Sequence, residues 1–142
     1  MSTSRDDIEA IPESQCLALL RNVVIGRLGV TTDDGGVDLF PVNFVVDRGE
    51  ILFRTAAGTK LERIEENPKV AFETDHFDWY ERTAWSVVVK GRATIVHERE
   101  DLIDLFEVDV LPWHADPKPY FVRLLPDSIT GRRFRVSPSR HP

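Results

Sequence analysis

Residues 51–64 read Ile-Leu-Phe-Arg-Thr-Ala-Ala-Gly-Thr-Lys-Leu-Glu-Arg-Ile, and this stretch decides how the rest of the chain is interpreted. The apolar run at 51–53 follows a turn signal and predicts a β-strand that is entered from a hairpin. Thr59, followed three residues later by Glu62, fits a capping box and predicts a helix with Thr59 at its N-cap. Asn67-Pro68 predicts the end of that helix. The stretch is therefore a strand that leads directly into a helix.

Residues with phosphate-binding chemistry lie between this strand and this helix. They are Arg54, Thr55, Gly58, Thr59 and Lys60. A helix N-terminus carries unpaired N–H groups and a partial positive charge, so it attracts anions. The cations, the hydroxyls and a glycine that lets the backbone come close together predict a phosphate cradle. The alternative is an ordinary helix start beside surface cations, and the stretch alone leaves both open. Neither a Walker A loop nor a dinucleotide-binding glycine pattern is present.

The composition is that of an ordinary globular domain. With 142 residues, 42% hydrophobic and 30% charged, the sequence predicts one domain over 1–142, with flexible ends at 1–10 and 137–142. The net charge of −6 argues against nucleic-acid binding. Cys16 is the single cysteine, so no internal disulfide forms, and no signal peptide or membrane-spanning run is visible. We expect a cytoplasmic protein with neither a membrane nor a nucleic-acid partner.

The hydrophobic pattern predicts a mainly β fold. The predicted strands are 24–31, 37–46, 51–55, 69–75, 83–97, 120–125 and 129–136. Short helices are predicted from Pro12, from Thr59 and over 101–110, with loops at 76–82 and 111–119 and a turn at 126–128. Pro41 predicts an edge position or a bulge, and Gly91 predicts a bulge or bend that curls a sheet. Because βαβ alternation is absent, an antiparallel β-barrel with a few short helices fits best.

Catalytic groups are not identified by any local motif. His76 lies beside Asp75 and Asp78 and could carry a proton, although a solvated loop histidine is the simpler interpretation. Glu73 and Asp75 share one face of a predicted strand, a pairing that strand alternation often produces by itself. Cys16 reads as a small core residue. No ligand spacing typical of a metal site is found, so we expect none.

Several motifs, taken in order, resemble a known family. They are Pro41-Val-Asn-Phe44, Ile51-Leu-Phe-Arg-Thr55, Gly58-Thr-Lys-Leu61, Val70-Ala-Phe-Glu-Thr-Asp75, Trp85-Ser-Val-Val-Val-Lys-Gly-Arg-Ala93, Pro112-Trp113 and Ile129-Thr-Gly-Arg-Arg133. Together they resemble the pyridoxamine 5'-phosphate oxidase-like family, and most closely its small FMN-binding members of actinobacterial type, to which nitroimidazole-resistance proteins are related. The resemblance covers most of the chain.

The resemblance implies an FMN-binding split barrel of antiparallel Greek-key type, with two flavin sites at the interface of a homodimer. It implies that Asn43 and the strand end Phe53-Arg54-Thr55 line the flavin ring and its ribityl chain. It also implies that Thr59 and Lys60 hold the phosphate, in agreement with the cradle predicted above.

Trp85 and Ser86 are implied to reach the flavin from the other subunit, and the pair Arg132-Arg133 is a further candidate for a phosphate or substrate contact. The C-terminal Arg- and His-bearing segment of the true oxidases has no counterpart after Val136, so oxidation of pyridoxamine phosphate is not expected.

The expected function is an FMN-dependent oxidoreductase that acts on an unidentified small molecule. One alternative is a non-catalytic flavin-binding or sensor protein. Another is a reductase that uses a deazaflavin, whose acidic tail would need a basic groove built from residues such as Arg27, Lys90 and Arg92.

Overall fold

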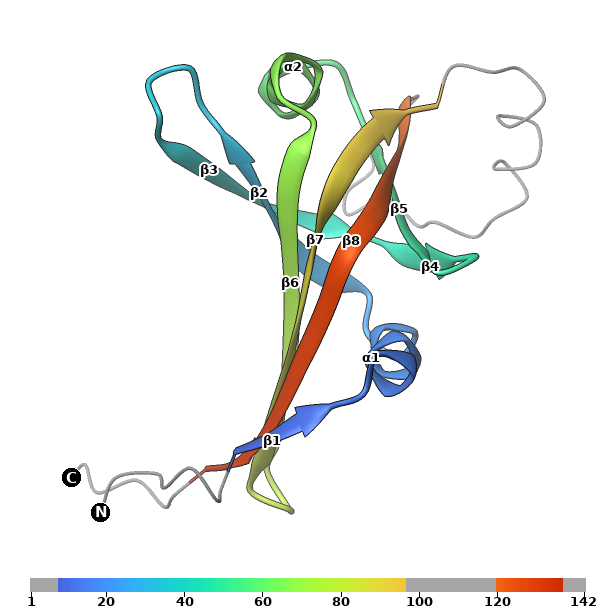
Figure 1. Ribbon diagram of the computed structural model, residues 1–142, viewed down its shortest axis with the longest axis vertical. Coiled ribbons are helices and arrows are strands. Elements are labelled where there is room, and N and C mark those ends of the chain that lie inside the picture. The colour runs from blue at the N-terminus through green and yellow to red at the C-terminus, as the bar shows by residue number, and fades with distance from the viewer. Residues whose placement is uncertain (1–7, 97–119, 137–142) are drawn as a thin grey trace.

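The computed structural model describes residues 8–96 and 120–136, which form one antiparallel eight-stranded sheet and two helices (Figure 1). The elements are β1 (Ile8–Ile11), α1 (Glu13–Leu20), β2 (Ile25–Thr31), β3 (Val37–Asn43), β4 (Val45–Asp47), β5 (Glu50–Thr55), α2 (Thr59–Glu66), β6 (Lys69–Asp78), β7 (Thr83–Ile95) and β8 (Tyr120–Arg135). The strand order is β3-β2-β6-β7-β8-β5-β4, and β1 pairs with β8. The run β6-β7-β8-β5 is a Greek key, because β5 lies beside the last of three consecutive strands.

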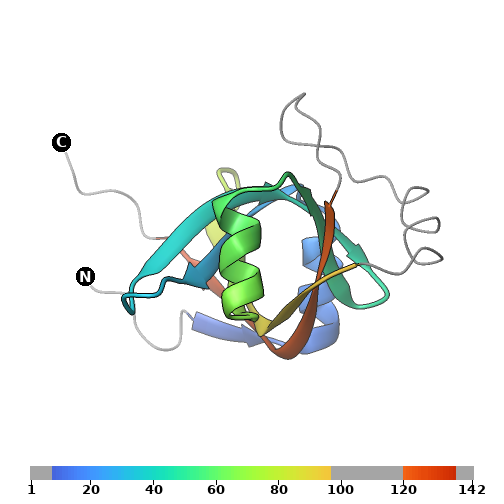
Figure 2. The ribbon, with the colours of Figure 1, turned by 90° about the horizontal axis from the view of Figure 1, so that it is seen from above.

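The sheet curls into a half-barrel around one hydrophobic core, which confirms the mainly β barrel expected from the sequence. Seen from above, the strands surround the core and α2 lies across the upper mouth (Figure 2). The inward residues alternate along each strand, as in Leu28 and Val30 of β2 or Val87 and Val89 of β7. Leu61 and Ile64 of α2, one helical turn apart, close the core from above.

A β-bulge between β7 and β8 allows the sheet to curl, as Gly91 predicts. Lys90 pairs with Ser128 and Gly91 pairs with Pro126, so Asp127 is the extra residue. A Cβ at Gly91 would lie 2.0 Å from the carbonyl oxygen of Leu125, so no larger side chain fits. The turn predicted at 126–128 is wrong: both predicted strands belong to the single strand β8, and the Pro-Asp-Ser sequence forms a bulge rather than a reversal.

The predicted strand 37–46 changes partner at Phe44. Before it, β3 pairs with β2; after it, β4 pairs with β5 at the opposite end of the strand order. The Phe44 ring is buried against Phe72, with ring centroids 4.7 Å apart, and this contact holds the crossing point in the core. Pro41 does lie on the edge strand β3, where its missing N–H costs no ladder bond.

Two further predictions are corrected. Residues 8–10, expected in a loose lead-in, belong to β1, which pairs Ile8–Ile11 with 131–134 of β8. The predicted loop at 76–82 is shorter, because β6 continues through Asp78 opposite β7. The predicted helix 101–110, the loop 111–119 and the C-terminal tail lie outside the described residues.

Candidate functional site

The junction between β5 and α2 brings together the five residues of the predicted phosphate cradle. Arg54 and Thr55 end β5, Gly58 precedes the helix, and Thr59 and Lys60 are its first two residues. Gly58 has a φ of +152° and nothing lies within 4 Å of the place where a Cβ would be. The space that a side chain at position 58 would occupy is therefore open, so the main chain there is accessible as well as the neighbouring side chains.

The helix start differs from the predicted capping box. Gly58, and not Thr59, is the N-cap, because its carbonyl accepts the first intrahelical bond, from the Glu62 N–H at 3.0 Å. Within residues 8–96 and 120–136, no side chain caps the helix. Thr59 is already inside the first turn, so its hydroxyl is not in position to cap. A helix start that no described side chain caps keeps its N–H groups and partial positive charge available, a situation that favours an anion at this end.

Both cations of the cradle lie against aromatic rings. The Lys60 ammonium lies 5.4 Å from the centroid of Phe40, on β3, and the Arg54 guanidinium lies 5.0 Å from that of Phe121, on β8. Such cation–π contacts limit the rotamers of the two side chains. The rings that contact the two cations both belong to strands of the sheet.

The other predicted residues on this side differ in accessibility. Phe53 is 0% exposed and packs in the core, so within one chain its side chain is closed off from any ligand. The Thr55 hydroxyl is buried and donates to the carbonyl of Ala56 at 3.2 Å. Asn43, at the end of β3, has a buried Oδ1 that finds no hydrogen-bond partner in the described part of the chain. An unsatisfied buried acceptor is costly, so this atom would be stabilised by a donor from outside the described residues.

Trp85 and Ser86 are not brought to the cradle within one chain. Phe53 pairs with Val122, which pairs in turn with Ile95 at the far end of β7. Trp85 is ten residues before Ile95, and this corresponds to about 33 Å of strand. The predicted site residues therefore form two groups, at opposite ends of the long strands.

The second group lies beside Arg132 and Arg133. Ser86 is opposite Arg132 on β8 and Asp75 on β6, whereas Trp85 is opposite Arg133 and His76. The His76 and Trp85 rings are 6.3 Å apart at their centroids. His76 therefore belongs to a strand end that carries an aromatic ring and two arginines, and not to a separate loop.

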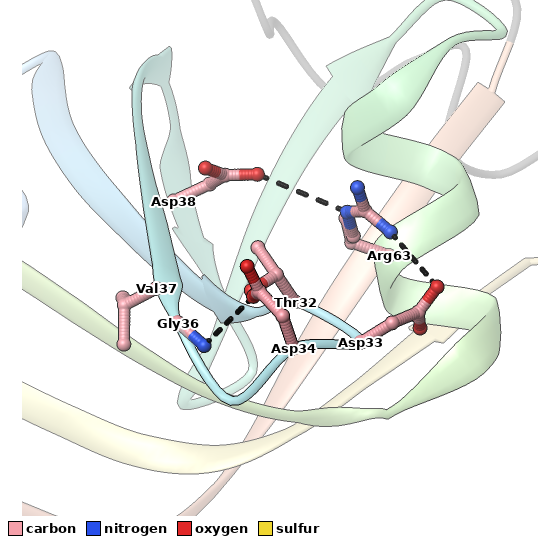
Figure 3. Close-up of a pocket in the computed structure, with 7 residues that line it drawn as sticks. All are labelled: Thr32, Asp33, Asp34, Gly36, Val37, Asp38 and Arg63. Carbon is pink, nitrogen blue, oxygen red and sulfur yellow. Dashed lines mark hydrogen bonds and ion pairs between the residues drawn. The ribbon is translucent and has the colours of Figure 1, made fainter.

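A polar pocket of about 390 Å³ lies beside α2 and was not apparent from the sequence (Figure 3). Its walls come from the β2–β3 hairpin and from Arg63, which is one helical turn beyond Lys60. The Arg63 guanidinium lies 3.6 Å from an oxygen of Asp33 and 3.8 Å from one of Asp38, and it also pairs with Glu66 at 3.2 Å. The hydrogen bond to Glu66, together with the surrounding carboxylates, raises the pKa of Arg63.

A second hollow region lies on the outer face of the sheet. Two adjoining grooves, of about 450 and 420 Å³, share a floor of Gly29 and Ala71. We call the groove of about 450 Å³, which contains Lys69 and Lys90, the upper groove, and the groove of about 420 Å³ the lower groove. The lower groove contains Arg27, whose guanidinium lies 2.8 Å from Glu73 and 3.5 Å from Asp75. Desolvation, followed by the neighbouring Asp75, raises the pKa of Glu73. The sequence had offered Glu73 and Asp75 as a pair, but the arginine between them comes from a distant strand.

Local signals in the sequence could have identified only part of these features. Lys60 and Arg63 are three residues apart, the spacing that places two cations on one helix face. The acidic residues at 33–38 read only as a turn, because nothing local indicates that they meet α2. In the part of the chain that the structure describes, no group of three or more His, Cys, Asp or Glu residues is placed to hold a metal ion. None of the helices within 8–96 and 120–136 is long and apolar enough to cross a bilayer.

Comparisons with known proteins give the chain a family. The sequence model of the pyridoxamine 5'-phosphate oxidase family matches residues 12–133. A solved structure from Corynebacterium glutamicum is 34% identical, with a TM-score of 0.81 over 95% of this chain and 99% of the other. The FAD binding protein from Mycobacterium smegmatis is 41% identical, with a TM-score of 0.78 over 91% of this chain and all (100%) of the other. The Mycobacterium tuberculosis protein Rv3129 is 41% identical over 88 residues, or 62% of this chain and 78% of the relative.

Proposed function

Because this chain belongs to the pyridoxamine 5'-phosphate oxidase family, we propose that it is a flavoprotein that binds FMN and uses it as an oxidoreductase on a small molecule. The cradle between β5 and α2 carries this proposal. An open backbone at Gly58, a helix start without a side-chain cap among the described residues, and two cations packed against aromatic rings suit a phosphate. The likeness to the FAD binding protein of Mycobacterium smegmatis supports a flavin as the bound group.

The residues present fit a phosphorylated flavin. In this proposal Thr59, Lys60 and the first N–H groups of α2 hold the phosphate, while Arg54 and Thr55 line the adjoining chain. The buried Oδ1 of Asn43 has no partner among the described residues and would accept a hydrogen bond from the cofactor. These groups bind and orient; bound FMN would supply the hydride and electron chemistry. This division of roles accounts for a site without a recognisable acid–base pair.

We also propose a homodimer, in which Trp85 and Ser86 complete the partner's flavin site. The distance along β7 between these residues and the cradle supports this arrangement, since one chain does not bring the two groups together. The outer sheet face is suited to the interface. It exposes Val37 and Leu39, which are 66% and 71% exposed, beside a depression floored by small residues. Side chains of one copy can fill the depression of the other.

Charge also favours pairing through this face. In the groove of about 450 Å³, Lys69 and Lys90 outnumber Asp127. In the groove of about 420 Å³, Glu73 and Asp75 outnumber Arg27. A two-fold axis through the middle of the face would bring the basic end of one copy to the acidic end of the other. Such complementarity fixes the register of two surfaces.

The first test is an absorption spectrum of the purified protein, followed by titration with FMN. The proposal expects about one flavin per chain. Lys60→Ala should weaken binding about tenfold or more, because a charged hydrogen bond to phosphate is lost. Arg21→Ala, which removes an exposed cation at the end of α1, should change the affinity little. Equal effects of the two substitutions would contradict the cradle.

A second measurement separates an oxidoreductase from a carrier. Steady-state oxidation of NADPH by the FMN-loaded protein, with oxygen or a quinone as acceptor, should exceed the rate of free FMN. Bound FMN without turnover would leave the cradle intact and would assign the chain to flavin storage or sensing.

A further inference from the structure

Two cations of α2, one helical turn apart, contact strand β3 in different ways. The Arg63 guanidinium lies 3.8 Å from a carboxylate oxygen of Asp38, whereas the Lys60 ammonium lies 5.4 Å from the centroid of the Phe40 ring. A carboxylate neutralises the cation that it pairs with, but an aromatic ring carries no net charge. The contact with Phe40 can therefore orient the Lys60 ammonium without adding a countercharge to it.

The sheet fixes the place of the Phe40 ring. Phe40 is opposite Leu28 in the ladder between β2 and β3, so its side chain is on the same face as that buried leucine. The side chain is half-buried and packs against the hydrophobic core. Strand pairing and packing thus hold the ring independently of Lys60, and the ring is a fixed surface on which the ammonium can rest.

The backbone of Lys60 is also fixed, but its side chain needs a contact of its own. Leu61, the next residue, and Ile64 are buried and anchor α2 across the mouth of the half-barrel (Figure 2). A lysine on a fixed backbone still has many rotamers, and ordering them when a ligand binds costs entropy. The contact with Phe40 restricts these rotamers before a ligand arrives, so less of that cost remains for the binding step.

We propose that Phe40 is a positioning residue of the flavin site, which holds the Lys60 ammonium in place for the phosphate of FMN. The inference rests on the proposed function, and it gives Phe40 a role that acts through Lys60. Because the effect is confined to the phosphate end, Phe40 should matter for FMN and not for riboflavin, which has the same ring system and no phosphate. A ring that only filled space in the core would affect both ligands alike.

The test measures the dissociation constants of FMN and riboflavin for the full chain by quenching of flavin fluorescence. Phe40→Leu, which keeps an apolar side chain and removes the ring, should weaken FMN binding about fivefold and leave riboflavin binding unchanged. Phe40→Met, a second variant without a ring, should give the same result. Phe40→Tyr keeps the ring and is the matched control, so it should retain the native affinity for FMN. The melting temperature of each variant checks that it is folded.

A double-mutant cycle tests whether the effect passes through Lys60. In a Lys60→Ala chain, which has no ammonium to hold, the further change Phe40→Leu should leave FMN affinity unchanged. Native FMN affinity in the Phe40→Leu chain, equal losses for FMN and riboflavin, or a full further loss in the Lys60→Ala background would each overturn the inference and leave the flavin site standing. Failure of the native chain to bind either flavin would overturn the proposed function together with the inference.

Discussion

The carboxyl group of Glu73, on the outer face of the sheet, makes the stability of the fold depend on pH. Its side chain is 34% exposed and forms an ion pair with Arg27, which also pairs with the neighbouring carboxylate of Asp75. Burial and Asp75 raise its pKa above the ordinary 4.5, although Arg27 opposes the shift. The folded protein therefore binds this proton more readily than the unfolded chain. The resulting stabilisation is complete below the unfolded pKa and is lost as pH rises through the folded pKa.

Glu73→Gln should remove this pH dependence. The melting temperature of the native chain minus that of the variant is expected to fall as pH rises from about 4.5 toward neutrality. Thermal unfolding at a fixed protein concentration measures the difference, and Glu65→Gln on the exposed side of α2 supplies the baseline for loss of one carboxylate. A difference that stays constant over this range, or rises with pH, would show that Glu73 does not bind its proton more tightly on folding.

At the scale of elements, the bulge at Gly91 decides whether β7 and β8 can bend together. The clash of an added Cβ is with the backbone of Leu125, which cannot move aside as a flexible side chain could. Gly91→Ala should therefore destabilise the fold by about 2 kcal/mol or more. Urea unfolding measures this, with the exposed neighbour Arg92→Ala as the control. Equal midpoints for the two variants would mean that the bulge can relax.

The elements also show how far the sequence alone can go. The hairpin β2–β3, strand β5, helix α2 and strand β7 follow from patterns within a few residues, and so does the bulge at Gly91. The break at Phe44 and the continuous path of β8 could not be predicted in the same way. Both depend on residues that are distant in sequence. Phe44 packs against Phe72, and Pro126 continues β8 because it pairs with Gly91 beside the bulge.

The same division holds for the candidate site. The order of Arg54, Thr55, Gly58, Thr59 and Lys60 is local, so the sequence could predict a cradle before any fold was known. Its cap was assigned to the wrong residue, because Gly58 and Thr59 are both acceptable N-cap residues and only the backbone geometry decides. The polar pocket beside α2 depends on contact between the β2–β3 hairpin and Arg63 of the helix, which are separated in sequence, and residue spacing does not reveal such a contact.

At the scale of the whole molecule, the dimer proposal connects the outer face with the flavin site. If Trp85 and Ser86 complete the partner's site, disrupting the face must also release the cofactor, although no residue of the cradle is changed. A substitution at Leu39 tests the proposed interface most directly, because this side chain is 71% exposed and lines the lower groove. A charge at this position would be buried without a partner in the dimer, whereas a monomer would leave it in water.

Leu39→Asp should therefore weaken the dimer about 100-fold and raise the concentration at which half of the chains are monomeric by the same factor. Sedimentation velocity measures the association, and the flavin absorbance that moves with the protein measures retention of the cofactor. Tyr80→Asp is the matched control, because Tyr80 is 98% exposed on the β6–β7 turn, outside both grooves. A Leu39→Asp protein that stays dimeric would exclude this face as the interface. A monomer that keeps its flavin as tightly as the native chain would exclude the shared site, because the cradle of one chain would then be sufficient.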